Sequence, residues 1–474
     1  MWESTCSASH DPIEVTMGTT RRFADWESRD EAQRRAALLR AHESVATLGR
    51  TLHAVVDVMP GTADTPEAAD GPLAGLTYVA KDMITTGVHA PSWGRAVPCT
   101  DIGARASVLR RLDAAGATLV ATAEMTELAY EPSGHNVSRG RVLNPWSFEH
   151  IVGGSSSGSA ALVAAGCCDV ALGSDTGGSV RIPAACCGIT GLKPTFGTLP
   201  LDGVMPLAET LDTLGVFARS AATLAHVWPV LSGIAPGDTA MPRRAVLLVD
   251  TFDACEPAVV QICEAAAAVL AQAGVVITKA AGFPEDVDRN ALVIMQAEAA
   301  RTHAALIDDP GTEPVLRKRL AKGLSIDDAA LAAARDARGP LAQEFLRDAL
   351  GDADVVLLPV MPIATPHVAA VTPGDPAFDP KRLYALSRFT RFVNVLGLPA
   401  LALPAGFDAA GLPVGLQIVG RPGAEARLLA LGQAFQARTS WHGRVPRAIV
   451  ETITTDQITT DAIATGAIAR GFAA

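Results

Sequence analysis

Serines and glycines are concentrated in two stretches of this chain, and together they could carry out acyl-transfer chemistry. The first stretch is 152–160 (VGGSSSGSA) and the second is 173–183 (GSDTGGSVRIP). Glycines allow backbone N–H groups to converge on one point, which the binding of a phosphate or of a developing oxyanion requires. Serine hydroxyls become nucleophiles when a neighbouring base activates them. The two stretches therefore indicate either an anion-binding loop or a serine nucleophile.

Three other interpretations of these stretches are possible. A nucleotide-binding P-loop is disfavoured because neither glycine cluster continues into the required Gly-Lys-Ser/Thr. A flexible linker is disfavoured because an Ala-rich segment and the expected strand 169–172 follow at once. Residues 154–158 (GSSSG) match the nucleophile elbow of α/β-hydrolases, with Ser156 as nucleophile, although 147–152 is a poor strand. This esterase-like alternative stays open and would need one of four later histidines: His226, His303, His367 or His442.

Lys81 is the cation that could activate a serine. It ends the apolar run 76–80 (LTYVA), and a charged residue in such a place usually has a partner or a task. An ion pair with the neighbouring Asp82 is one explanation. The other is catalytic, because desolvation favours the neutral form of a lysine, which can then act as a base near neutral pH. In that case no histidine is needed.

The surrounding segments predict an α/β fold. Short β-branched runs alternate with Ala-rich helical segments, and the same texture returns late in the chain. The expected strands include 76–80, 117–122, 353–359 and 400–404, and the expected helices include segments within 21–50, 106–115 and 424–438. Both ends of the chain are therefore expected to build one architecture.

We expect a single large domain over 21–447. Its core motifs span 75–220, a mostly helical elaboration covers about 257–350, and the core returns over 353–447. The leader 1–20 and the tail 448–474 have no clear hydrophobic period, so we expect both to lie outside the domain.

Composition excludes several classes of function. The net charge of −11 and the pI near 5.4 argue against partners such as nucleic acid or an anionic membrane surface. No secretory signal or run of about 20 apolar residues is recognisable. The eight cysteines include the pairs 167–168 and 186–187 without CxxC spacing, which is typical of buried thiols rather than a metal site. We therefore expect a cytoplasmic enzyme.

Longer motifs resemble the amidase signature family. Residues 153–159 (GGSSSGS), 173–183 and 188–194 (GITGLKP) are similar to the motif that names the family, and the likeness extends from about 75 to about 446. The resemblance implies a mixed β-sheet covered by helices on both sides. It also implies an amidohydrolase that needs neither a metal nor a cofactor.

The resemblance also implies roles for individual residues. Ser179 would be the nucleophile, Ser155 a bridging serine that follows an unusual cis peptide bond, and Lys81 the base. The spacing of the two serines is the one that the family uses. The oxyanion hole and its supports would then come from two sets of residues: the backbone N–H groups of Thr176, Gly177, Gly178 and Ser179, and the side chains of Asp175 and Arg181.

Ile182 narrows the expected substrate. The amidotransferase members of the family typically have glutamine at this position, and malonamidase-like enzymes place an arginine there, so Ile182 favours a free-standing hydrolase of neutral small molecules. Aryl amides, anilides and carbamates of the urethane type fit this expectation, with the enzyme a monomer or homodimer. A glutaminase-type subunit of a larger complex remains the alternative. The expected pocket residues are Ala129, Tyr130 and Met205.

Overall fold

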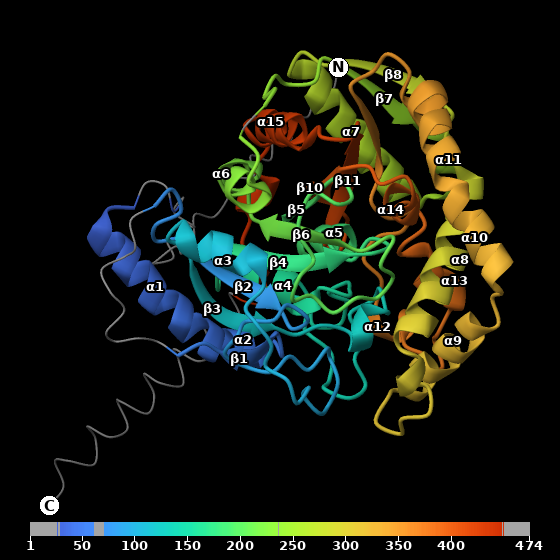
Figure 1. Ribbon diagram of the computed structural model, residues 1–474. Coiled ribbons are helices and arrows are strands. Elements are labelled where there is room, and N and C mark those ends of the chain that lie inside the picture. The colour runs from blue at the N-terminus through green and yellow to red at the C-terminus, as the bar shows by residue number, and fades with distance from the viewer. Residues whose placement is uncertain (1–25, 27–28, 61–70, 236, 448, 450–474) are drawn as a thin grey trace, which may run out of the picture.

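One eleven-stranded β-sheet organises the chain (Figure 1). The computed structural model describes residues 26, 29–60, 71–235, 237–447 and 449. The expected leader 1–20, and the expected tail 448–474 apart from residue 449, lie outside these described residues. The bounds 21–447 for one domain stay a prediction.

The sheet is mixed, with the order β1-β3-β2-β4-β6-β5-β10-β11-β9-β7-β8. Strands β3, β2 and β4 run parallel to one another, as do β9, β7 and β8, and the pairs between these two groups are antiparallel. The strands have these bounds: β1 (Val55–Val58), β2 (Thr77–Lys81), β3 (Thr118–Ala123), β4 (Val170–Asp175), β5 (Thr190–Lys193), β6 (Thr213–Ala218), β7 (Arg244–Leu248), β8 (Val276–Ala280), β9 (Val355–Pro359), β10 (Ala400–Phe407) and β11 (Pro413–Gly420).

Alternate residues of one strand pack on opposite faces of the sheet, as the two-residue period of a strand requires. In β9, Val355 and Leu357 join one hydrophobic cluster while Val356 and Leu358 join another. All five residues of β9 are buried. The sheet is therefore covered on both faces, which confirms the α/β fold with helices on both sides.

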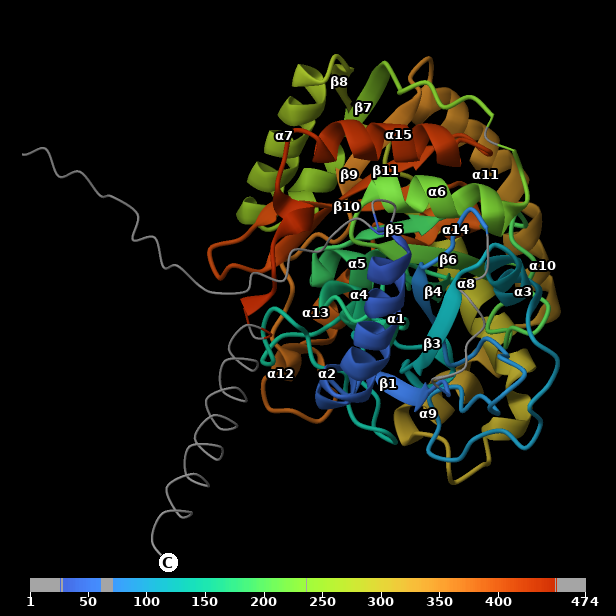
Figure 2. The ribbon, with the colours of Figure 1, turned by 90° about the vertical axis from the view of Figure 1, so that its left-hand side faces the viewer.

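Helices α3, α6, α7 and α15 pack on one face, and α1, α4, α5, α8, α10 and α14 pack on the other. Figure 1 shows α8 to α11 gathered along one side of the molecule, and Figure 2 shows α6 and α15 lying across the sheet. The helices have these bounds: α1 (Glu31–Ala46), α2 (Leu48–Thr51), α3 (Ser107–Ala114), α4 (Ser157–Ala164), α5 (Arg181–Cys187), α6 (Ala221–Ser232), α7 (Pro257–Gln272), α8 (Glu285–Thr302), α9 (Pro314–Leu324), α10 (Asp328–Asp336), α11 (Arg338–Phe345), α12 (Val368–Val371), α13 (Pro380–Ala385), α14 (Arg391–Val395) and α15 (Glu425–Gln436).

The region 257–350 is mostly helical and also contains the edge strand β8, which pairs with β7. The expectation that the cysteines are buried thiols needs one correction. Of the seven described cysteines, all of them free thiols, Cys99 and Cys255 are half-buried rather than buried. No helix in the described ranges is both long and apolar enough to cross a membrane.

Candidate active site

Lys81 is fully buried at the end of β2, where its side chain meets two serine hydroxyls. Its Nζ lies 2.7 Å from Ser155 Oγ and 2.8 Å from Ser174 Oγ. Burial lowers the pKa of Lys81 to about 7, against the opposing attraction of Asp175 and Asp212. The neutral form of the lysine, which can accept a proton, is therefore accessible near neutral pH.

Asp82 does not pair with Lys81. Its carboxylate instead accepts hydrogen bonds from the backbone N–H of Ser92, at 2.9 Å, and from the Ser92 hydroxyl. The ion pair that the sequence left open is thus not formed between these two described residues. Lys81 has hydroxyl partners, which suit a base, instead of a carboxylate partner, which would hold its proton.

Ser155 is positioned by an unusual backbone. The peptide bond between Gly154 and Ser155 is cis. The space around Gly154 explains the glycine, because a Cβ there would lie 2.7 Å from the Glu131 carbonyl oxygen and 2.8 Å from the Gly134 nitrogen. The Ser155 carbonyl accepts the N–H of Thr126 at 3.2 Å, and its hydroxyl faces Lys81.

Ser156 lacks the surroundings of a nucleophile elbow. Its side chain is fully buried, and its hydroxyl bonds to the carbonyl and the N–H of Ser174 at 3.2 and 3.3 Å. Residues 147–152 form no strand, apart from an isolated bridge at His150. The geometry therefore does not support Ser156 as the reactive serine.

The loop between β4 and α5 is held by a buried ion pair. Arg181 Nη2 lies 2.8 Å from Asp175 Oδ1, and neither side chain is exposed. Burial alone would raise the pKa of Asp175, but the Arg181 guanidinium, with smaller contributions from Lys193 and Asn394, outweighs it and brings that pKa to about 2. Asp175 also accepts the N–H groups of Gly178, at 2.9 Å, and Val180, at 3.2 Å. These contacts fix the loop from its two ends.

The same contacts show which of the expected oxyanion donors are already bound to other groups. The N–H of Gly178 is engaged by Asp175, so it is not free in this structure. The N–H groups of Thr176, Gly177 and Ser179 have no acceptor within the described residues. Three of the four expected donors are therefore available to a bound oxyanion, and their role stays a prediction.

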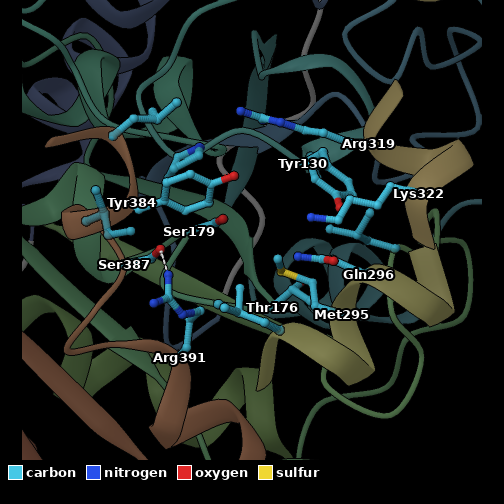
Figure 3. Close-up of a pocket in the computed structure, with 17 residues that line it drawn as sticks. Tyr130, Thr176, Ser179, Met295, Gln296, Arg319, Lys322, Tyr384, Ser387 and Arg391 are labelled. Atoms are coloured by element: carbon cyan, nitrogen blue, oxygen red, sulfur yellow. Dashed lines mark hydrogen bonds between the residues drawn. The ribbon is translucent and has the colours of Figure 1, made fainter. Parts of the chain in front are cut away.

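Ser179 lies at the wall of a cavity (Figure 3). It is 9% exposed, and its hydroxyl makes no hydrogen bond to another described residue, Ser155 included. The cavity combines apolar and polar groups, and its other lining residues are Ala129, Tyr130, Pro132, Thr176, Gly177, Ile182, Leu207, Leu292, Met295, Gln296, Arg319, Lys322, Leu383, Tyr384, Ser387 and Arg391. A reacting carbonyl in this cavity would meet a hydroxyl free to attack it.

Two of the three expected pocket residues line this cavity. Ala129 and Tyr130 do so, and Ala129 has a φ of +57°, a left-handed conformation that is unusual outside glycine. Met205 does not line it. That side chain is 4% exposed within a hydrophobic cluster, and Leu207, two residues later, faces the cavity instead. The expectation for Met205 was therefore wrong.

Much of the cavity comes from segments that carry no recognisable motif. Helix α8 supplies Met295, α9 supplies Arg319 and Lys322, and α13 supplies Tyr384. The basic run 317–322 was the available signal, but a run of charges more often marks a solvated helix face. Within the described residues, Arg319 and Lys322 form no ion pair, and Arg319 lies over the ring of Tyr130.

Comparisons with known proteins agree with this geometry. The family model described as Amidase matches residues 53–429. A glutamyl-tRNA(Gln) amidotransferase subunit from Ralstonia pickettii (strain 12J) is 32% identical over 470 residues, which cover 86% of this chain and 91% of that protein. A crystal structure of an amidase matches with a TM-score of 0.76 and 30% identity over 85% of this chain and 96% of the other. The 6-aminohexanoate cyclic dimer hydrolase, complexed with substrate, matches with a TM-score of 0.78 and 26% identity over 88% and 96%.

Proposed function

This chain belongs to the amidase signature family, and on that premise we propose that it hydrolyses the C–N bond of small-molecule amides. We assign the base to Lys81, the proton bridge to Ser155 and the nucleophile to Ser179. The observation that carries this assignment is the buried 2.7 Å contact between Lys81 Nζ and Ser155 Oγ, beside a cavity onto which Ser179 opens.

The proposed reaction begins with a proton relay. Neutral Lys81 takes the proton of Ser155, which takes that of Ser179 as the Ser179 oxygen attacks the amide carbon. The free N–H groups of the loop stabilise the oxyanion. When the C–N bond breaks, the relay returns its proton to the departing nitrogen, and a water activated by the same relay then hydrolyses the acyl ester. Every proton is accounted for by the three side chains and water.

The substrate that we propose is uncharged near the scissile bond. Ile182 offers no charge there, and Leu207, Met295, Tyr130 and Tyr384 supply apolar or aromatic walls. Such walls suit an aryl amide, an anilide or an aryl carbamate. We also keep the cytoplasm as the proposed location, together with a monomer or homodimer as the proposed assembly.

A second candidate is the glutaminase-type component of an amidotransferase. The specific observation in its favour is that Arg319 and Lys322 reach the cavity without an ion pair among the described residues, so they could receive the carboxylate of glutamine. The relatives named as subunits of glutamyl-tRNA(Gln) amidotransferase are consistent with it. Ile182 counts against it, since glutamine is typical at this position in such proteins.

One panel separates the two candidates. The purified chain is first sized by gel filtration, and the release of amine or ammonia is then measured for an anilide, an aliphatic amide, an aryl carbamate and glutamine. We expect the chain alone to turn over the anilide or the carbamate faster than glutamine, and Ser179→Ala to abolish this. If the chain turns over glutamine fastest and the Arg319→Gln variant loses this preference, the second candidate would be favoured. If the chain hydrolyses none of the four compounds, the result would count against a free-standing hydrolase.

A further inference from the structure

Two residues of the α14 segment contact the loop that carries the free N–H groups. Thr390 occupies the N-cap position of α14, and Asn394 follows four residues later, so both lie on one face of the helix. Asn394 Nδ2 donates to the Asp175 carbonyl oxygen at 2.8 Å, and Thr390 Oγ1 donates to the Gly177 carbonyl oxygen at 2.6 Å. The carbonyl groups of Asp175 and Gly177 are thus held by the α14 segment, and the Thr176 carbonyl between them is not.

Holding a carbonyl also fixes the direction of an N–H group. In a trans peptide the C=O and the N–H point in opposite directions, and the peptide bonds of this loop are trans. The contact from Asn394 to the Asp175 carbonyl therefore aims the Thr176 N–H away from α14. The Gly177–Gly178 peptide is held at both ends, because its N–H donates to Asp175 Oδ1. The Thr176 N–H and the neighbouring Gly177 N–H are left without acceptors among the described residues, and both residues line the cavity.

Arg181 fixes the orientation of both contacts. Its Nη2 donates to Asn394 Oδ1 at 2.7 Å, which leaves the amide nitrogen of Asn394 to face the loop. Its Nη1 donates to the Thr390 carbonyl oxygen at 2.9 Å. The guanidinium is fully buried, so these bonds are shielded from water.

We propose that Asn394 and Thr390 are positioning residues, which hold the loop so that the N–H groups of Thr176 and Gly177 meet the oxyanion that forms on Ser179. The inference rests on the proposed function. Close packing supports it, since Thr390 Oγ1 lies so near the Gly178 backbone that a Cβ at position 178 would approach it to 2.2 Å, and the contact therefore requires glycine there. Neither residue is among those that line the cavity, so both would act through the loop.

The test uses Thr390→Val, which removes the hydroxyl and keeps the shape, and Asn394→Ala. Each variant is assayed with the best amide of the panel and with two inhibitors. One is a trifluoromethyl ketone, whose carbonyl carbon is attacked by Ser179 to give an oxyanion, while the Ser179 proton passes to Ser155 and the Ser155 proton to Lys81. The other is the matching secondary alcohol, which forms no bond. We expect kcat to fall about tenfold to a hundredfold, since the loss of one direct donor costs about 10²–10³.

The two inhibitors distinguish positioning from a structural role. The Ki of the trifluoromethyl ketone should rise by the same factor as kcat falls, while KM and the Ki of the alcohol change less than about threefold. Thr390→Ser should restore both values. An equal weakening of ketone and alcohol, or an unchanged kcat in Thr390→Val, would overturn the inference even if Asn394→Ala fails to fold.

Asn144→Ala is the matched control. Asn144 is also fully buried and also donates to backbone carbonyls, those of Ile151 and Cys186, at 2.7 and 3.1 Å. The Asn144→Ala variant should be less stable, but the ratio of its affinities for the ketone and the alcohol should not change. A changed ratio would contradict the positioning role of Asn394 and Thr390. A wild-type protein without amidase activity would refute the proposed function itself, so the two failures remain distinguishable.

Discussion

Two fully buried lysines end strands of the same sheet, and their surroundings differ. Lys81 ends β2 and Lys193 ends β5. Burial lowers the pKa of each to about 7. Lys81 donates to two serine hydroxyls, whereas Lys193 donates to the carbonyl oxygens of Pro194 and Leu398, at 2.8 and 2.7 Å.

The partner groups distinguish Lys81, the base in the proposed mechanism, from Lys193, to which we assign a structural role. A carbonyl oxygen accepts hydrogen bonds and has no proton to give, so Lys193 can bind its partners and cannot deprotonate them. A hydroxyl does both, so a neutral Lys81 can reverse the direction of its bond and receive the proton of Ser155. Burial and a lowered pKa alone would not have distinguished the two lysines.

The largest expected effect separates the lysines directly. Lys81→Ala should fold and lose turnover by about 10³-fold or more, because general-base catalysis supplies roughly 10²–10⁴ and the nucleophile depends on it. Lys193→Ala should instead lower the free energy of unfolding, since each carbonyl left without a donor costs about 1–3 kcal/mol. Initial rates per folded molecule and thermal unfolding measure the two quantities. Comparable losses of turnover in both variants would break the comparison.

The next effect is the pH dependence of turnover. The pKa of Lys81 is lowered to about 7, so its neutral form prevails above that pH and its protonated, inactive form below it. The rate should therefore fall about tenfold for each pH unit below about 7. Since Lys193 shares this pKa, Lys193→Met tests the assignment. The break in the profile should persist in that variant, and its disappearance would assign the titration to Lys193.

Ser174→Ala should have an intermediate effect. It removes one of the two hydroxyls that accept from Lys81 Nζ and leaves Ser155 in place. Because a hydrogen-bond acceptor stabilises the ammonium form, its loss should lower the pKa of Lys81 further and move the break in the pH profile to lower pH. We expect turnover at pH 8 to fall no more than about tenfold. A break that moves to higher pH would contradict this account.

Single histidine substitutions should have the smallest effect. Replacing each with glutamine should change turnover less than about threefold, because the proposed relay uses no imidazole. The four candidates are His226, His303, His367 and His442. Loss of more than a hundredfold in any of them would restore the histidine-based alternative.

The sequence predicted the core of the fold because its strands are regular. Strands such as β2 and β9 are fully buried runs and were recognisable from their apolar, β-branched residues. Strand β8 was missed because all five of its residues are exposed or half-buried, and one such run within a helical region gives little signal. Its position follows from pairing with β7, which is a long-range property.

The part of the site that comes from one continuous motif could be predicted, and the part that comes from distant segments of the chain could not. Residues 173–181 carry the loop and its buried ion pair in one motif. Asn394 and Tyr384 come from segments far later in the chain, and nothing in their local sequence marks them. The error at Met205 has a simple cause, since periodicity does not say which of two nearby apolar residues faces a cavity.

The most direct test of the central claim is covalent labelling with a fluorophosphonate, in which the serine oxygen bonds to phosphorus and fluoride leaves. Peptide mapping by mass spectrometry should place a single adduct on Ser179, formed at a rate that rises with pH to a plateau above about pH 7. In Lys81→Met the labelling should slow by about 10³-fold. An adduct on Ser156, or undiminished labelling in Lys81→Met, would contradict the account.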